Sequence, residues 1–317
     1  MDLEKSHNEI PQISSDEEKP PLLLRQLVFM RFKRHKMAVA GVIILLLMIL
    51  YSVGGSFFIE EDASLFTDTT IRLNAPSPEH WFGTDVVGRD ILARTIYGGQ
   101  ISLMIGLVAM VVEVIVGVVI GALAGYYGGI LDSILMRFTE AMLNIPQLPL
   151  LLVLGKLLAD KIAPVSIFGR QFSGSVIVII VVIGLTSWMG LARIVRANFL
   201  SLREQEFVTA ARCTGTKNWS IIFEHILPNT MAPIIVSATL AVANAIISEA
   251  YVSFLGVGVL PPTATWGNML NGAYNYIESA PWLWIFPGSL IVLTVLSINF
   301  IGDGLRDALD PRALTQD

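Results

Sequence analysis

The sequence predicts an all-α integral membrane protein with six transmembrane helices, and three observations lead to this class. Hydrophobic residues make up 54% of the 317 residues and charged residues only 15%. The mean hydropathy of +0.66 lies far above that of soluble domains. Six apolar runs also approach the roughly 20 residues of helix that cross a bilayer core of about 30 Å. These three observations together make the lipid bilayer the expected environment. No basic cluster of the kind that binds nucleic acid is present, so nucleic acid is not an expected partner.

Two segments precede the first apolar run. Residues 1–21 are acidic and polar, and no apolar run follows a short basic start, so they predict a disordered tail and not a secretory signal. Residues 22–36 mix apolar and basic side chains at helical spacing, which predicts an amphipathic helix on the membrane surface. A plain continuation of the first spanning helix explains that pattern equally well.

The candidate spans are long runs with few charges. They cover residues 37–59, 101–126, 141–159, 176–192, 232–255 and 282–301. The third departs most from an ideal span, because Pro146 and Pro149 fall near its start and Lys156 near its end. Prolines in the first turn of a helix are tolerated, since the first amides lack acceptors within the helix.

Basic residues predict the orientation of the chain. They crowd the segment before the first span and the loop 193–229, and basic loops are retained in the cytoplasm. Six spans place both regions on the same side together with a C-terminal tail at 303–317. The sequence therefore predicts that both termini lie in the cytoplasm.

Two longer segments are expected outside the cell. Residues 60–100 carry glycines and a charge cluster in which Asp85, Arg89 and Asp90 can pair, with a short amphipathic element near their end. Residues 256–281 hold prolines, glycines and aromatic residues but almost no charge. They predict a small folded cap over an external opening, or else an aromatic belt at the membrane surface.

Three polar side chains stand inside the candidate spans, namely Glu113, Asn244 and Glu249. Burying such a group in hydrocarbon is expensive, so each is expected to face protein or a water-filled cavity. They are candidates for a translocation pathway. A buried glutamate that holds two helices together by hydrogen bonding is the alternative.

The polar loop 193–229 is longer than a connection between neighbouring spans requires. Its pattern predicts two short helices, the first ending at Gly215 in the left-handed conformation and the second capped by Asn218 and broken at Pro228. The pair Ala210-Ala211 would then project from the membrane, where small side chains let a partner approach. An ordinary hairpin with helix-favouring alanines fits the same pattern.

Several enzyme classes are excluded by missing motifs. The sequence lacks the phosphate-binding loop G-x-x-x-x-G-K-[ST], and it also lacks H-E-x-x-H and G-x-S-x-G. Its four histidines do not cluster, and Cys213 is its single cysteine. The chain is therefore expected to bind no metal or cofactor and to catalyse no reaction itself.

Four motifs resemble one transporter family over nearly the whole chain. VTAARCTGTKNWSIIFEHILPN is similar to the coupling loop of bacterial ABC importer permeases, in which two alanines, a glycine four residues later and a Leu-Pro pair mark the coupling helices. HWFGTDVVGRDILARTIYGGQISL, EAYVSFLGVGVLPPTATWGNML and GDGLRDALDP resemble the C-type permease of dipeptide and oligopeptide importers.

The resemblance implies a type I ABC importer permease in a bacterial cytoplasmic membrane. It implies a homologous second permease, two cytoplasmic ATP-binding subunits that hold ATP and Mg²⁺, and an extracytoplasmic substrate-binding protein. The residues that it assigns to coupling with the ATPase are Thr209, Ala210, Ala211, Gly215, Leu227 and Pro228. The pattern of the loop adds Phe207 and Trp219 as large apolar anchors for the partner.

Two positions depart from the family pattern. Thr209 stands where the general motif has glutamate, and His225 stands where it has an aliphatic residue. Both are compatible with docking, but no salt bridge can form at the first of these positions.

The expected function is import of dipeptides or oligopeptides, with nickel-chelate or glutathione import as the alternative inside the family. A stand-alone channel or secondary transporter and an intramembrane enzyme are the alternatives from other classes. The first would work without an ATPase, whereas the second would need a catalytic constellation that the sequence lacks.

Overall fold

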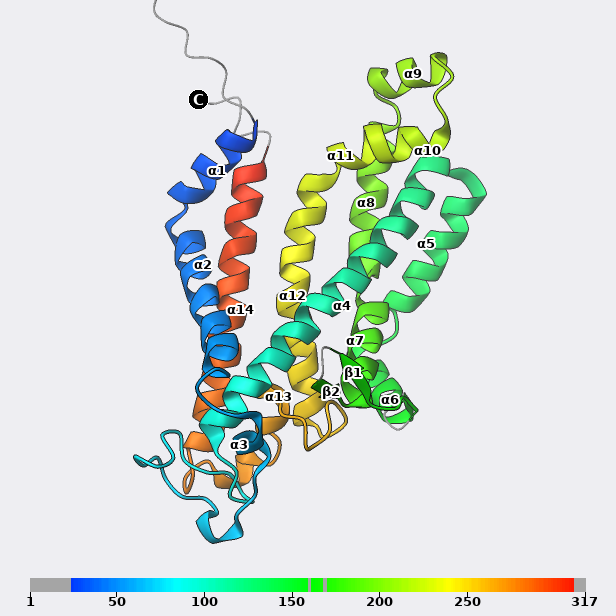
Figure 1. Ribbon diagram of the computed structural model, residues 1–317. Helices are drawn as coiled ribbons and strands as arrows, with labels where there is room; N and C mark the ends of the chain where they lie inside the picture. The colour runs from blue at the N-terminus through cyan, green and yellow to red at the C-terminus, as the bar shows by residue number, and fades with distance from the viewer. Residues whose placement is uncertain (1–23, 159–160, 168–169, 311–317) are drawn as a thin grey trace, which may run out of the picture.

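The protein folds as a bundle of long helices whose connections gather at two opposite ends (Figure 1). This structure is a computed structural model, and it describes residues 24–158, 161–167 and 170–310. Among these residues, four helices are long and apolar enough to cross a membrane. They are α2 (Lys36–Ile49) continued by the π-helical turn η1 (Leu50–Gly54), α4 (Ile91–Tyr127), α12 (Met231–Phe254) and α14 (Trp282–Leu309).

Two bent helix pairs supply the rest of the membrane-embedded chain. They are α5 (Gly129–Leu143) with α6 (Gln147–Leu158), and α7 (Gly174–Ser187) with α8 (Met189–Leu202). The expected all-α membrane architecture is confirmed, and the described residues reach six spans only if each bent pair counts as one.

Shorter elements cover the two ends. They are α1 (Leu24–Arg34), α3 (Glu61–Leu65), η2 (Thr69–Ile71), β1 (Val165–Ile167), β2 (Arg170–Phe172), α9 (Glu206–Cys213), α10 (Asn218–Ser220), η3 (Ile221–Ile226), α11 (Leu227–Asn229), α13 (Trp266–Met269) and η4 (Ala273–Tyr276). Figure 1 shows α1, α9 and the C-terminal end of α14 at one end, with α3 and α13 at the other. The sequence also places these groups on opposite sides. The antiparallel hairpin β1–β2, which pairs Val165 with Phe172, was not expected.

The prediction of one span over residues 141–159 is wrong. Helix α5 starts at Gly129 and ends at Leu143, and α6 leaves it at an angle of 86°. The break precedes Pro146, because a proline restricts the residue before it and cannot donate a backbone hydrogen bond. Charged residues early in α5 hid its start, since they argue against membrane burial when read alone.

Several predicted helix boundaries also move. Helix α4 begins at Ile91, where the Asp90 side chain accepts a hydrogen bond from the Ala93 amide, so the expected short element at the surface is its first turns. Span 176–192 bends by 40° and continues as helix to Leu202, into the expected loop. Helix α14 runs on to Leu309, past the expected start of the tail at 303.

The first span ends earlier than expected. Its helix stops at Gly54, with Gly55 as the cap, whereas the apolar run predicted residue 59. The amphipathic segment expected at 22–36 forms α1 over its described part, and α1 packs against α14. The tail expected at 1–21 lies outside the described residues.

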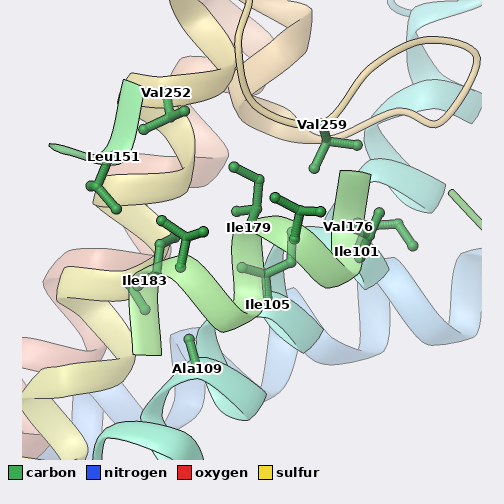
Figure 2. Close-up of a cluster of buried hydrophobic side chains, with 12 residues drawn as sticks. Ile101, Ile105, Ala109, Leu151, Val176, Ile179, Ile183, Val252 and Val259 are labelled. Carbon is green, nitrogen blue, oxygen red and sulfur yellow. The ribbon is translucent and has the colours of Figure 1, made fainter. Parts of the chain in front are cut away.

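One apolar core joins four helices, α4, α6, α7 and α12 (Figure 2). Ile105 of α4, Ile179 of α7 and Val252 of α12 are all buried in it. Leu151 of α6 and Val259 of the loop after α12 reach the same cluster. The bent helix α6 is therefore part of the core, and the loop that follows α12 folds back over it.

Glycines allow α8 to lie directly against α4. A Cβ atom placed on Gly121 would lie 2.5 Å from the Ala192 carbonyl oxygen, and one on Gly125 would lie 2.5 Å from the Phe199 Cβ. Gly117 meets Leu191 and the Trp188 carbonyl in the same way, one turn earlier. Small residues at four-residue steps permit this close contact between helix backbones.

We predict that Gly121→Ala lowers the thermal unfolding midpoint of the purified protein, whereas Gly190→Ala does not. Overpacking of a tight contact costs about 1–3 kcal/mol. Gly190 lies in α8 with no other atom within 4 Å of an added Cβ, so alanine there only favours the helix. Equal destabilisation of both variants, measured by intrinsic tryptophan fluorescence in detergent, would contradict the close α4–α8 contact.

Candidate functional site in the polar loop and the spans

Helix α9 presents one face to the protein and the other to its surroundings. Val208 is fully buried and Ala211 is 8% exposed, whereas Ala210 is exposed. The helical period places Ala210 between Glu206 and Cys213, which are also exposed. The prediction that both alanines project is therefore wrong for Ala211, which packs inward. Ala210 alone has the expected position.

Gly215 ends α9 as expected. Its φ of 75° is left-handed, and two backbone hydrogen bonds close the turn, from the Gly215 amide to Arg212 O at 3.0 Å and from the Thr216 amide to Ala211 O at 3.1 Å. This pair of bonds is the Schellman motif. A Cβ at Gly215 would meet no atom of the described chain within 4 Å. Glycine is therefore needed here for its backbone conformation, and the space beside it is open.

An apolar cluster connects this loop to three membrane helices. Each of its members is buried, and they come from α4, α8, α9, η3 and α12. They are Ala122, Tyr126, Leu191, Val195, Phe199, Val208, Ala211, Ile221, Ile222, Ile226 and Ile234. Because one continuous core runs from α9 into α4, α8 and α12, a displacement of α9 is resisted by the packing of all three.

Polar contacts of Tyr126, at the end of α4, reinforce this connection. Its hydroxyl donates to Asn218 Oδ1 at 2.7 Å, and the Arg212 guanidinium lies 5.7 Å from the centre of its ring. Arg203 donates through Nη1 to the carbonyl oxygens of Gly125, at 3.0 Å, and Tyr126, at 3.4 Å. The expectation that Asn218 caps a helix is wrong, because Asn218 is the first residue of α10 and Lys217 holds the cap position. The Asn218 side chain instead binds Tyr126.

An ion pair ties α8 to α5 at the same end. Arg196 donates through Nη2 to Asp132 Oδ2 at 2.6 Å and through Nε to Asp132 Oδ1 at 2.5 Å. Two parallel bonds of this kind fix the relative orientation of the partners. The first turns of α5 therefore follow α8.

The helical segment after Gly215 carries exposed aromatic side chains. Trp219 is 68% exposed, and its ring centre lies 4.2 Å from that of Phe223. Phe207 on α9 and Pro228 are also exposed, while Leu227 is half-buried. The segment does not break at Pro228, because its last turn ends at Asn229 and α12 begins two residues later. Thr209 is exposed beside Ala210.

Glu249 is sealed inside the protein. It is completely buried, and its carboxylate accepts hydrogen bonds from Ser253 at 2.7 Å and Ser102 at 3.4 Å. The Ser102 hydroxyl also accepts from the backbone amide of Trp266, whose indole donates to Thr95 O at 2.9 Å. These contacts join α4, α12 and α13, so they favour the structural alternative for Glu249 over a pathway role.

The other two polar candidates have different surroundings. Asn244 is exposed midway along α12, and the helical period places Ser237, Ser248 and Tyr251 on the same face. Glu113 is half-buried on α4. Within the described chain, neither Asn244 nor Glu113 forms a side-chain hydrogen bond or ion pair. The face of α12 with Ser237, Asn244, Ser248 and Tyr251 forms a polar stripe. Because polar groups are costly in hydrocarbon, this stripe is expected to face protein or water.

Sequence reasoning missed the residues that hold the loop in place. Tyr126 stands at the end of a span, so its position predicts an aromatic side chain at the membrane surface. The positions of Arg203 and Asp132 predict charges in contact with water. Their partners lie 64 or more residues away along the chain, and no local pattern shows such pairing. Among the described residues, no group of three or more His, Cys, Asp or Glu side chains could hold a metal ion.

Comparison with known proteins assigns the chain to a family of transporter components. Residues 117–315 match the family described as binding-protein-dependent transport system inner membrane component, and the chain belongs to this family of multi-pass membrane proteins. Residues 24–76 match the N-terminal transmembrane domain of oligopeptide transport permease C. The family is a transporter component, which confirms that the chain is not an enzyme.

Curated relatives cover most of the chain. The dipeptide transport system permease protein DppC of Alkalihalophilus pseudofirmus is 43% identical over 284 residues, or 90% of this chain and 88% of the relative. The oligopeptide transport system permease proteins OppC of Bacillus subtilis and of Escherichia coli strain K12 are 39% and 42% identical. The match to the Bacillus subtilis protein covers 93% of this chain and 92% of the relative. The match to the Escherichia coli protein covers 89% of each chain.

We predict that Tyr126→Phe loosens the loop without unfolding the helices. Removing the hydroxyl leaves Asn218 Oδ1 without its donor, a loss of about 1 kcal/mol, which raises local hydrogen exchange about fivefold. Exchange of peptides from residues 206–229, followed by mass spectrometry, measures this effect. Tyr127→Phe is the control, because Tyr127 is 51% exposed. Equal exchange in both variants would show that this hydrogen bond does not hold the loop.

A second prediction separates the two roles of Glu249. Glu249→Gln keeps an acceptor for a serine hydroxyl, so stability and transport should change little, whereas Glu249→Leu leaves buried hydroxyls unsatisfied at a cost of about 1–3 kcal/mol. Thermal unfolding of both variants, with transport assayed in reconstituted vesicles, tests this. A stable Gln variant that transports nothing would instead place the carboxylate in the pathway.

Proposed function

We propose that this chain forms half of the translocation pathway of an ATP-driven peptide importer. It receives the driving force through the exposed face of α9, which carries Ala210. The single observation that carries the proposal is the apolar cluster that runs from α9 into α4, α8 and α12. The curated relatives, whose names specify dipeptide or oligopeptide transport, support peptides as the cargo.

The ATPase partner docks against exposed side chains of the loop. Ala210 leaves room for close approach, while Phe207 and Trp219 provide apolar anchors on either side of it along the chain. Thr209, Gly215 and Pro228 complete this surface, and Ala211 and Leu227 support it from below. ATP and Mg²⁺ bind to the two partner ATPase subunits, since the chain lacks a phosphate-binding loop.

The orientation of the chain in the membrane follows from the docking of the ATPase on α9. The end that carries α1, α9 and the C-terminal end of α14 faces the cytoplasm, with both termini, and the basic residues of α1 support this side. The end that carries α3 and α13 faces outward, where a substrate-binding protein delivers cargo. A homologous second permease completes the pathway.

Coupling proceeds by rigid-body movement. When the ATPase subunits close, they displace α9, and the buried cluster transmits the displacement to α4, α8 and α12 together. The Arg196–Asp132 ion pair carries α5 with them. Access to the pathway thereby changes from one side of the membrane to the other.

The pathway itself runs along the exposed polar face of α12. Asn244 is its central residue, with Ser248 and Tyr251 on the same face. Glu113 belongs to it as the half-buried acidic group of α4, and Glu249 supports the wall from inside. Nickel chelates and glutathione remain alternative cargoes for a permease of this kind, and a ligand-retention assay on the cognate binding protein distinguishes them from peptides.

We predict that Ala210→Glu abolishes peptide uptake while the protein stays folded and inserted. The residue is exposed, so the added carboxylate costs the fold little but obstructs the docking surface. Uptake of a labelled peptide into proteoliposomes containing the whole importer measures the effect, and pull-down of the ATPase subunits shows its cause.

Ala75→Glu is the control for the pull-down, because it makes the same change at an exposed position of the opposite end and should leave ATPase binding unchanged. Full uptake by the Ala210→Glu variant would refute docking at this face. Ala211 is a poorer choice for this experiment, because substitution there disturbs the buried cluster before any partner binds.

A further inference from the structure

A large cavity lies at the end of the molecule opposite α9. Its volume is about 1620 Å³, well above the roughly 300–1,000 Å³ of ordinary small-molecule pockets. The lining residues all belong to the stretch from Tyr51 to Ile96, which includes the end of the first span, α3 and the first turns of α4. Figure 1 shows α3 beside the start of α4 at this end.

Apolar side chains form much of the cavity wall and its rim. Ile96 is buried in the wall, while Phe58 is 90% exposed and Trp81 is 69% exposed. Phe58 follows the last turn of a membrane-spanning helix. Aromatic residues at this depth mark the boundary between hydrocarbon and headgroups. The cavity therefore opens where lipid headgroups meet the protein.

The polar part of the lining is acidic. Asp62, Asp68 and Glu79 contribute carboxylates, and the lining within the described chain includes no lysine or arginine. His80 Nδ1 lies 2.8 Å from Asp90 Oδ2, so the Asp90 carboxylate already has a partner. The Thr70 hydroxyl and amide donate hydrogen bonds to Asp68 and hold the pKa of its carboxyl below the usual value. The cavity thus joins an apolar wall to a negatively charged rim.

We propose that this cavity binds an outer-leaflet phospholipid whose headgroup carries an ammonium group, as in phosphatidylethanolamine. The ammonium group faces the carboxylates of Asp62, Asp68 and Glu79, and the acyl chains lie along the apolar wall near Phe58 and Ile96. A headgroup of net negative charge is repelled by the same carboxylates. Charge complementarity therefore selects among the lipids that surround the protein.

The position of the cavity separates it from the transport pathway. Its lining includes no residue of α7 or α12, whereas the polar stripe with Asn244 lies on α12. The lipid site is thus independent of the proposed function, and either can fail without the other.

Lipid retention by the intact importer tests the proposal. The complex is reconstituted with equal amounts of phosphatidylethanolamine and phosphatidylglycerol, re-extracted in detergent, and its bound lipids are counted by native mass spectrometry. Asp62→Asn/Glu79→Gln should retain about 2- to 30-fold less phosphatidylethanolamine, as expected for the loss of two surface charge contacts. Glu60→Gln/Glu278→Gln is the charge-matched control, since neither residue lines the cavity.

A second variant tests the apolar wall. Leu92→Trp fills the cavity from the first turn of α4 without changing charge, and it should also reduce retention. Equal retention of both lipids by the unmodified complex, or equal loss in the charge-matched control, would overturn the proposal. Displacement of the retained lipid by added dialanine would also overturn it, because the cavity would then belong to the cargo.

Discussion

Close packing of α8 on the glycine face of α4 is the constraint on which the rest of the structure depends. Gly121 and Gly125 leave no room for a Cβ, so the two backbones lie in direct contact up to the end of α4. There Tyr126 enters the buried cluster beneath α9. A loop at the surface is thereby fixed to helices that cross the membrane, and force applied to the loop has a rigid path inward.

The end of the molecule that carries α3 and α13 is held by a different kind of interaction. Glu249 and Trp266 share Ser102, so α4, α12 and α13 are joined by buried hydrogen bonds. Asp85 accepts from Arg89 at 2.7 Å and lies 3.7 Å from Arg94, which fixes the loop before α4 to its first turn. Helices α4 and α12 therefore connect an apolar junction at one end to a polar junction at the other.

The sequence predicted most of this architecture where the pattern was local. The helix stop at Gly215 follows from one residue type, and the six apolar runs follow from hydropathy. It failed at the bend before Pro146, because charged residues in α5 hid the helix that precedes the bend. It also failed at the inward side of Ala211, which depends on packing against distant segments. The partners of Tyr126 and Glu249 were hidden for the same reason, since residues far apart in the chain supply them.

The central claim is that the exposed face of α9 binds the ATPase in the cytoplasm. The accessibility of Cys213 tests this claim most directly. This exposed thiol is the only cysteine in the sequence and lies beside Ala210 on that face. A membrane-impermeant maleimide should label it in inverted vesicles stripped of ATPase subunits, and rebinding of those subunits should protect it. Labelling from the outside of intact cells, or labelling unaffected by the ATPase, would contradict the account.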